Sequence, residues 1–221
     1  MHALDRPRNE YRKVTPATRR ARARRGEGDL LRAEILAAAE RLLIETGDQG
    51  AVSIRAIADA AGVTPPSIYM HFADKKQLLT AVCEVRFADL DRYMTDAVRG
   101  IEDPLDALWG RGRAYVRFGL ENPEHYRIMF MTRPLTDDRF GDTDLLPGLT
   151  AFSHLVDEVA RCMDAGAISP GDPFLVATSL WTVVHGITSL LIARPDFPWP
   201  DLDRLMALVV DVQTKGLQGG G

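Results

Sequence analysis

The side chains best suited to chemistry lie between residues 69 and 75. Tyr69 and His71 offer an O–H and an N–H donor, and Lys75 offers an ammonium group. Lys75 directly follows Asp74, a candidate helix cap, so its ammonium and the backbone N–H groups of the helix start can meet at one phosphate. The pattern predicts phosphate binding. The alternatives are an idle, solvated Lys75 and packing of part of the Tyr69 and His71 rings against a neighbouring helix.

Patterns typical of enzymes are missing from the sequence. It contains no GxSxG, HExxH, glycine-rich phosphate loop or paired-carboxylate pattern, so an enzyme built on His185 with Ser189 or an aspartate has little support. Cys83 and Cys162 lie far apart and outside any CxxC or Cys/His cluster, which disfavours a disulfide framework and a zinc site. We expect a non-enzymatic protein of a reducing compartment, without a metal or a cofactor.

Charge is distributed unevenly along the chain. Residues 1–25 hold nine basic and two acidic residues, a net charge of +7, while the whole chain has a net charge of -4. Such basic blocks are commonly disordered and bind phosphate backbones, so we predict a basic arm over residues 1–28. A solubilising tail and a start codon placed too early are the alternatives. The arm has no apolar run typical of an export signal, which predicts a cytoplasmic protein.

The length and composition predict a globular protein rather than a membrane protein. The chain has 221 residues, of which 46% are hydrophobic and 26% charged, and this length suits two domains. Residues 174–193 form an uncharged segment of 20 residues, about the length of a membrane-spanning helix. Because hydroxyl and imidazole groups are spread along it, we predict a buried helix in a soluble protein without membrane contact.

The spacing of apolar residues is typical of helices along the whole chain and predicts an all-α fold. The first helix covers residues 29–47, with Asp29 as its N-cap and Gly47 just past its end. Later helices are expected near residues 104–121, 123–131, 147–165, 172–193 and 201–215. Residues 132–146, rich in Asp and Gly, are predicted to be a loop, and residues 194–200, with three prolines, a rigid connector.

Two short helices are predicted between the first helix and a longer helix that follows Asp74 and runs to about residue 95. Ser53 can cap the first of them and Gly62 can end it. Thr64 can cap the second, in which Pro65 takes the first position, where a missing N–H is harmless. This is the arrangement of a DNA-binding helix-turn-helix, whose second helix lies in the major groove. The expected core residues are Ile54, Ile57, Ile68, Phe72 and Leu78.

Residues 63–79 sharpen this interpretation. Their sequence is Val-Thr-Pro-Pro-Ser-Ile-Tyr-Met-His-Phe-Ala-Asp-Lys-Lys-Gln-Leu-Leu, and its Tyr-x-His-Phe-x-x-Lys-x-x-Leu-Leu core resembles the signature of TetR-family transcriptional regulators. The resemblance spans residues 30–82, within a DNA-binding domain that we place at residues 29–82. It implies an all-helical homodimer that binds a palindromic operator in double-stranded DNA.

The resemblance also implies which residues contact DNA: Ser53, Arg55, Thr64, Pro65, Ser67, Tyr69, His71 and Lys75. Arg55 is the strongest candidate for reading bases, because a guanidinium binds a guanine edge or a phosphate with two donors. The hydroxyl of Thr64 can instead serve only as a helix cap. Pro65 departs from the family, whose members often carry a polar or basic side chain there. Sequence readout at this position is therefore weaker or apolar, which gives Arg55, Ser67 and the basic arm more weight.

The C-terminal domain, residues 83–217, resembles a second family feature. Trp181-Thr-Val-Val-His185-Gly186, together with residues 121–130, resembles the Trp-His-Gly type of TetR C-terminal domain. The resemblance implies that helices near residues 172–193 and 201–215 form a four-helix bundle between two subunits, in which Gly186 allows close helix approach.

Aromatic side chains predict an apolar effector site between the helices near residues 104–131 and 147–193. The candidates are Trp109, Tyr115, Phe118, Met129, Phe152, Trp181 and His185. His185 or His154 can anchor a carboxylate or hydroxyl, although an aromatic stripe is also typical of a core. The usual outcome in the family is a repressor that a small ligand releases. Activation, and a constitutive DNA-binding or architectural protein whose C-terminal domain only dimerises, are the alternatives.

Overall fold

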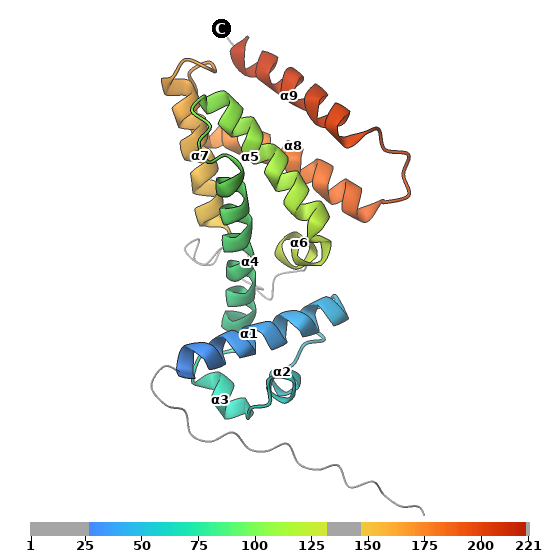
Figure 1. The fold of residues 1–221 in the computed structure, drawn as a ribbon. Coiled ribbons are helices and arrows are strands. Elements are labelled where there is room, and N and C mark those ends of the chain that lie inside the picture. Colours follow the sequence, from blue (N-terminus) through green and yellow to red (C-terminus); the bar gives the residue numbers. More distant parts are fainter. Residues whose placement is uncertain (1–26, 132–146, 220–221) are drawn as a thin grey trace, which may run out of the picture.

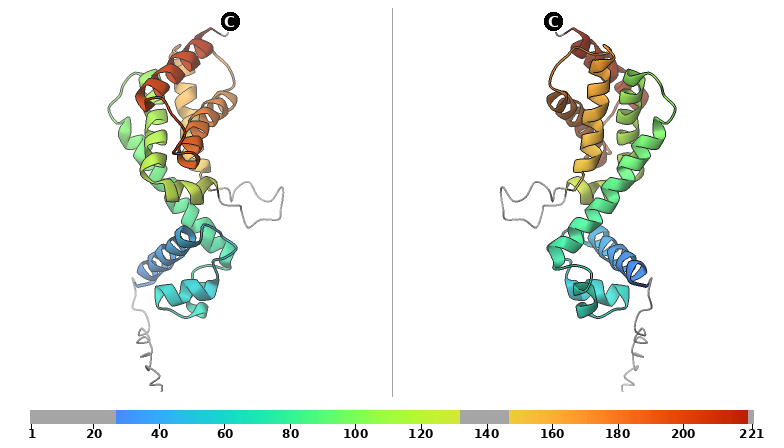
Figure 2. Two further views of the ribbon diagram at one scale, coloured as in Figure 1. Left: turned by 90° about the vertical axis from the view of Figure 1, so that its right-hand side faces the viewer. Right: turned by 90° about the vertical axis from the view of Figure 1, so that its left-hand side faces the viewer.

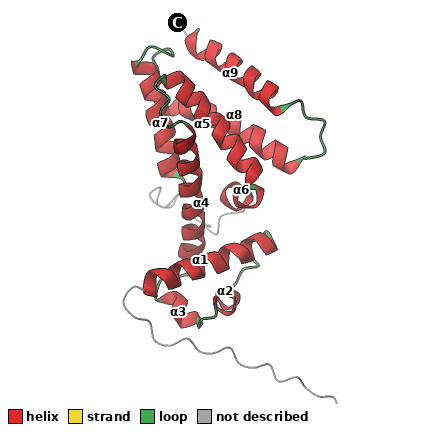
Figure 3. Cartoon of the chain, viewed as in Figure 1, coloured by secondary structure: helices red, strands yellow, loops and turns green. Residues whose placement is uncertain are grey.

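The computed structural model describes residues 27–131 and 147–219, so most of the predicted basic arm and the predicted loop at 132–146 lie outside the described residues. The described residues form nine α-helices and no strand, which confirms the all-α prediction (Figures 1 and 3). The helices are α1 (Glu27–Thr46), α2 (Ile54–Ala61), α3 (Pro65–Tyr69), α4 (Lys75–Ala97), α5 (Pro104–Glu121), α6 (Pro123–Phe130), α7 (Leu149–Asp164), α8 (Pro173–Ala193) and α9 (Leu202–Gln218).

The first three helices and the start of α4 enclose one core. Ile57, Ile68, Phe72 and Leu78 are at most 2% exposed, and Ile54 packs at the edge of the same cluster. These are the five residues predicted for the core. Since they come from α2, α3, α4 and the turn between the last two, their burial fixes the short helices against one another.

The ends of α1 differ in how well the sequence predicts them. Gly47 ends the helix as expected, with a left-handed φ of 64° and its N–H bonded to the Leu43 carbonyl at 2.8 Å. The prediction that Asp29 is the N-cap is wrong, because α1 already begins at Glu27. Asp29 instead lies in the first turn, where a carboxylate is still favoured by the helix dipole. An acidic residue in the sequence therefore predicts the first residue of a helix only to within about one helical turn.

Helix α4 belongs to both halves of the molecule. It runs without a break from Lys75 to Ala97 and so passes through the predicted domain boundary at residues 82 and 83. Figures 1 and 2 show its first turns beside α1 and its later turns beside α5 and α7. Cys83 still belongs to the N-terminal core, whereas Leu90 and Met94 belong to the C-terminal core. A movement of α4 therefore changes the packing of both halves.

Helix α6 forms a second connection between the halves. Ile128 is 4% exposed and is buried in the N-terminal core. Glu40 on α1 lies 3.1 Å from the Arg86 guanidinium of α4 and 3.3 Å from the His125 ring of α6. The N-terminal unit is therefore attached to the C-terminal unit at α6 as well as through α4.

Helix α8 is long and apolar enough by length and composition to cross a membrane, although such a helix also occurs in soluble proteins. The sequence predicts that it is buried, and this is only partly correct. Its fully buried residues are Ala177, Leu180, Thr188 and Ile192, which form one face. Leu175 and Leu190 are 67% and 52% exposed. Among the described residues α8 packs mainly against α5 and α7, and the ribbon of α9 lies further from it in Figure 1, although Val210 and Leu217 of α9 pack against the cluster that includes Leu180.

Candidate nucleic-acid interface and ligand cavity

The turn between α2 and α3 forms as the sequence predicts. The Ser53 hydroxyl accepts the Ala56 N–H at 3.1 Å and caps α2. Gly62 ends α2 in the left-handed conformation, with φ 68°, which glycine adopts without a steric penalty. Pro65 occupies the first position of α3. The short helix, glycine turn and short helix are therefore fixed by local backbone chemistry.

Thr64 has the position of an N-cap but not its hydrogen bond. Its hydroxyl lies 2.9 Å from the Ser67 hydroxyl, and no side-chain cap bond is formed. The reason is local: Pro66 has no N–H to offer, and the Ser67 N–H is bonded to the Thr64 carbonyl at 2.9 Å. The prediction that the Thr64 side chain caps α3 is therefore wrong.

One face of α3 is anchored and the other is open. Ile68 is completely buried, whereas Tyr69 is 54% exposed and Met70, at the C-cap of α3, is 84% exposed. Thr64 is exposed, and Pro65 and Ser67 are half-buried. Met70 is a candidate contact that the sequence analysis missed. Its place between two predicted donors, Tyr69 and His71, is the signal that points to it.

The remaining predicted DNA contacts lie at the ends of neighbouring helices. Ser53 and Arg55, at the start of α2, are exposed. Lys75 is half-buried at the first position of α4, where Asp74 caps the helix by accepting the Gln77 N–H at 2.7 Å. His71 is half-buried and lies next to Gly28 on α1. Hydroxyl, guanidinium and ammonium donors thus gather around α3, an arrangement that suits a phosphate backbone and the edges of bases.

A large cavity of about 1340 Å³ runs from between α4, α5, α7 and α8 of the C-terminal half to the N-terminal half, where Arg32, His71 and Lys76 are among its lining residues. Trp109, Tyr115, Met129, Phe152 and Trp181, which were predicted to bind an effector, all line it. It also reaches residues the sequence analysis did not select, from α4 (Phe87, Leu90, Met94), α5 (Arg111) and α7 (Leu155). Mostly apolar walls with a few polar groups are typical of small-molecule sites.

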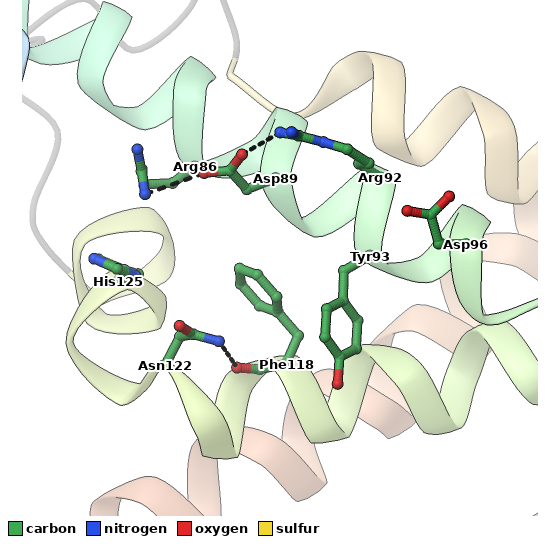
Figure 4. A pocket seen from close by; sticks show the side chains of 8 residues that line it. All are labelled: Arg86, Asp89, Arg92, Tyr93, Asp96, Phe118, Asn122 and His125. Carbon is green, nitrogen blue, oxygen red and sulfur yellow. Dashed lines mark hydrogen bonds and ion pairs between the residues drawn. The ribbon is translucent and has the colours of Figure 1, made fainter.

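Phe118 and His185, the other two predicted effector residues, are not among the residues that line this cavity. Phe118 faces a separate pocket of about 330 Å³ between α4 and the junction of α5 and α6 (Figure 4). Charged side chains of α4, including the Arg92–Asp89 ion pair, form its rim. Phe118 is therefore placed at a polar surface pocket rather than at the apolar chamber.

His185 lies in a hydrogen-bonded chain of aromatic side chains. Its Nδ1 is 2.7 Å from the Tyr126 hydroxyl and 3.1 Å from the Tyr115 hydroxyl, and Tyr115 accepts the Trp181 indole N–H at 3.3 Å. Burial lowers the pKa of His185 and raises the pKa of both tyrosines. The four side chains therefore form a neutral network that holds Tyr115 and Trp181 in place at the wall of the cavity.

The described residues contain no cluster of three or more His, Cys, Asp and Glu that could hold a metal ion. Cys83 and Cys162 are buried thiols whose pKa values burial raises to about 11. Neither is therefore an activated nucleophile.

Comparison with known proteins agrees with this architecture. Residues 35–82 match the model of bacterial regulatory proteins of the tetR family, and residues 109–212 match the tetracyclin repressor-like C-terminal domain. The HTH-type transcriptional activator FasR of Mycolicibacterium smegmatis is 30% identical over 122 residues, which is 55% of this chain and 55% of that protein. The tetracycline repressor protein class A from transposon 1721, of Escherichia coli, is 32% identical over 100 residues, 45% of each chain. The matched region spans about half the length of these two relatives.

A solved structure extends the likeness over most of the chain. A protein of unknown function from Rhodococcus sp. RHA1 superposes with a TM-score of 0.70 at 28% identity, covering 85% of this chain and 95% of that one. With a helix-turn-helix at one end, a helical C-terminal domain at the other, and both family models matched, the protein belongs to the TetR family of transcriptional regulators. The proteins of this family and the two relatives are transcription regulators rather than enzymes.

Proposed function

We propose that this protein is a ligand-responsive repressor that binds a palindromic operator as a homodimer and is released by a small apolar effector. The observation that carries the proposal is the course of α4. Lys75, at its first position, comes directly after the turn that follows α3, while Phe87, Leu90 and Met94, further along the same helix, line the cavity. A ligand that changes the packing around α4 therefore acts on the element that holds the DNA-binding face.

The exposed faces of α8 and α9 support the homodimer. Leu175, Ser179, Thr182, Gly186 and Leu190 follow one another at helical spacing along the uncovered side of α8. Beyond its chain neighbours and its own helix backbone, no described atom lies within 4 Å of a Cβ built on Gly186, so this side has room for a second helix. Leu208 and Val212 of α9 are 60% and 56% exposed. A second copy of the chain that covers these stripes removes them from water.

Linkage connects the two sites. Two recognition helices of a dimer enter successive major grooves only when they lie about 34–36 Å apart. A ligand that binds more tightly to a dimer with a different spacing of these helices lowers the affinity of the protein for DNA. The size of this decrease is set by the ratio of the ligand's affinities for the two dimer conformations. The sign of the effect on transcription depends on where the operator lies, and among the relatives one is called an activator and the other a repressor. A regulator of this kind acts on chromosomal DNA, so we expect the protein in the cytoplasm.

The test is binding of the purified protein to the promoter region of its own gene, followed by fluorescence anisotropy across a salt series. We expect the wild-type protein to bind the promoter DNA more tightly than random DNA. If the Arg55 guanidinium reads a base, Arg55→Ala should reduce this difference in binding free energy by about 1–3 kcal/mol. An apolar compound that fills the cavity should then release the DNA. Binding without preference for the promoter argues against an operator there, and selective binding that no cavity ligand weakens supports a constitutive DNA-binding protein.

A further inference from the structure

Arg111 on α5 is a buried cation at the wall of the cavity. Its side chain is only 8% exposed and is among those lining the chamber. Nη1 lies 3.4 Å from Asp91 Oδ1, and Nη2 lies 3.2 Å from Thr95 Oγ1. Both distances exceed the roughly 2.7–2.9 Å of a charge-assisted hydrogen bond. The Nε–H has no hydrogen-bond partner within the described ranges 27–131 and 147–219.

Asp91, the nearest acid to Arg111, is bound more closely by another group. The His154 Nδ1 lies 2.9 Å and 3.0 Å from the two carboxylate oxygens of Asp91. The Arg111 guanidinium therefore has only one long contact with a carboxylate, and that carboxylate is already bound to His154. A buried guanidinium is costly unless its charge and its N–H groups are satisfied, so Arg111 retains donors for a further acceptor.

The neighbours of Arg111 in the cavity wall are mostly apolar. Tyr115 lies one turn further along α5 and therefore on the same side of the helix, Leu90 and Met94 come from α4, and Leu155 comes from α7. The polar groups near the guanidinium are those of Asp91, Thr95 and His154. Around Arg111 the chamber thus combines apolar walls with a cation that is incompletely paired, whereas Arg32 and Lys76, which line the same cavity, belong to the N-terminal half.

We propose that Arg111 binds the acidic head group of the effector and that the ligand is an amphipathic carboxylate with an apolar body. This rests on the proposed function and names the ligand class of the same cavity. A carboxylate has two coplanar acceptor oxygens that match the geometry of a guanidinium, and its charge completes the pairing of Arg111. A neutral ligand of equal length leaves the Nε–H unbonded, and a cationic ligand is repelled.

The first measurement uses the wild-type protein and displacement of the neutral fluorophore N-phenyl-1-naphthylamine. Decanoate, decan-1-ol and decyltrimethylammonium share one apolar chain and differ in the charge of the head group. We expect decanoate to bind roughly 10-fold or more tightly than the alcohol, and the cation to bind weakest. Equal displacement by all three overturns the proposal without the use of any variant.

Two arginine variants on α5 test whether the preference for decanoate depends on Arg111. Arg111→Met removes the charge and keeps an apolar stem, and Arg113→Met makes the same change at an exposed position two residues away. We expect Arg111→Met to weaken decanoate binding roughly 10-fold and to leave decan-1-ol binding within about twofold, with no effect of Arg113→Met. A retained preference for decanoate in folded Arg111→Met contradicts the role of Arg111. Helicity and the melting temperature establish that each variant is folded.

The outcomes separate this inference from the proposed function. If none of the probes and not even the fluorophore binds the wild-type protein, the cavity is not a ligand site, and both proposals fail together. If the fluorophore and the alcohol bind as well as decanoate, the ligand cavity stands and only the carboxylate assignment fails.

Discussion

Hydrogen bonds fix the helix end at which Lys75 lies, and there we propose that Lys75 binds a phosphate. Asp74 accepts the Gln77 N–H at 2.7 Å, and the Gln77 side chain in return accepts the Ala73 N–H at 2.5 Å. This reciprocal cap fixes the first turn of α4 and leaves the N–H groups of its first residues directed away from the helix. The Lys75 ammonium shares that end, which favours a negative charge.

We predict that Lys75→Ala weakens binding to operator and random DNA to a similar extent. Loss of one phosphate contact reduces the slope of log K against log salt concentration by about 0.9. Fluorescence anisotropy at several salt concentrations measures this slope. Lys215→Ala, on α9 far from α3, is the matched control and should leave it unchanged. An unaltered slope in Lys75→Ala would show that this lysine does not contact a phosphate.

His185 is expected to make stability depend on pH. Burial lowers its pKa below the ordinary value of 6.5, so the folded protein keeps the ring neutral where the unfolded chain already binds a proton. Protonation of His185 therefore does not reduce the free energy of unfolding of the protein above about pH 6.5. Below that pH the free energy of unfolding decreases, until the pH reaches the pKa of the folded state. Urea denaturation at pH 7.5 and 5.5 measures the decrease. In His185→Asn it should be smaller than in wild type, and an equal decrease would contradict the prediction.

At the scale of elements, glycines on α5 determine how closely its neighbours pack. A Cβ on Gly119 would lie 2.3 Å from Thr188 Cγ2 of α8 and 3.0 Å from the Tyr126 ring of α6. Thr188 is completely buried, and its hydroxyl is bonded to the Val184 carbonyl at 2.7 Å, so it has little freedom to move. The contact between α5 and α8 therefore depends on the missing side chain at residue 119.

We predict opposite effects for two glycine substitutions on this helix. Gly119→Ala should destabilise the protein by about 1–3 kcal/mol because the added methyl group overpacks the contact with α8. Gly112→Ala is the control, since its Cβ would meet only Val184 Cγ1 at an ordinary 3.6 Å. It should be neutral or stabilising by up to about 1 kcal/mol, the helix propensity difference. Urea denaturation compares the two, and equal free energies of unfolding would contradict the role of Gly119.

At the scale of the whole molecule, the uncovered side of α8 is where we propose that a second subunit binds. This side carries Leu175 and Leu190 at its two ends and the small residues Ser179, Thr182 and Gly186 between them. The described part of the chain does not cover it. In the proposed dimer, the second subunit buries this stripe as α5 and α7 bury the opposite face.

We predict that Leu190→Arg shifts the protein from dimer to monomer. The guanidinium places an unpaired charge within the proposed contact between the two subunits, where desolvation opposes association. Sedimentation velocity measures the mass of the species in solution. Leu30→Arg makes the same change at an exposed leucine of α1 and should leave the mass unchanged. A Leu190→Arg protein that remains a dimer would place the interface elsewhere.

The sequence by itself determined the helices and the turn. Ser53, Gly62, Pro65 and Asp74 act on the backbone within three residues of their own position, so their roles are visible without tertiary contacts. The apolar periodicity located the buried faces for the same reason. It did not locate Asp29 within its helix, because an acid is favourable at several positions of a first turn.

The tertiary structure decided which side chains meet across the interior. Phe118 and His185, like Tyr115 and Trp181, are ring-bearing residues of the C-terminal helices and were predicted to bind the effector for that reason. Only Tyr115 and Trp181 line the large cavity. Arg111 appears in the sequence as one of many arginines, and its burial beside Asp91 becomes visible only when α4, α5 and α7 pack together. Such contacts join residues far apart in the chain, and their geometry depends on how whole helices cross, which local propensity does not specify.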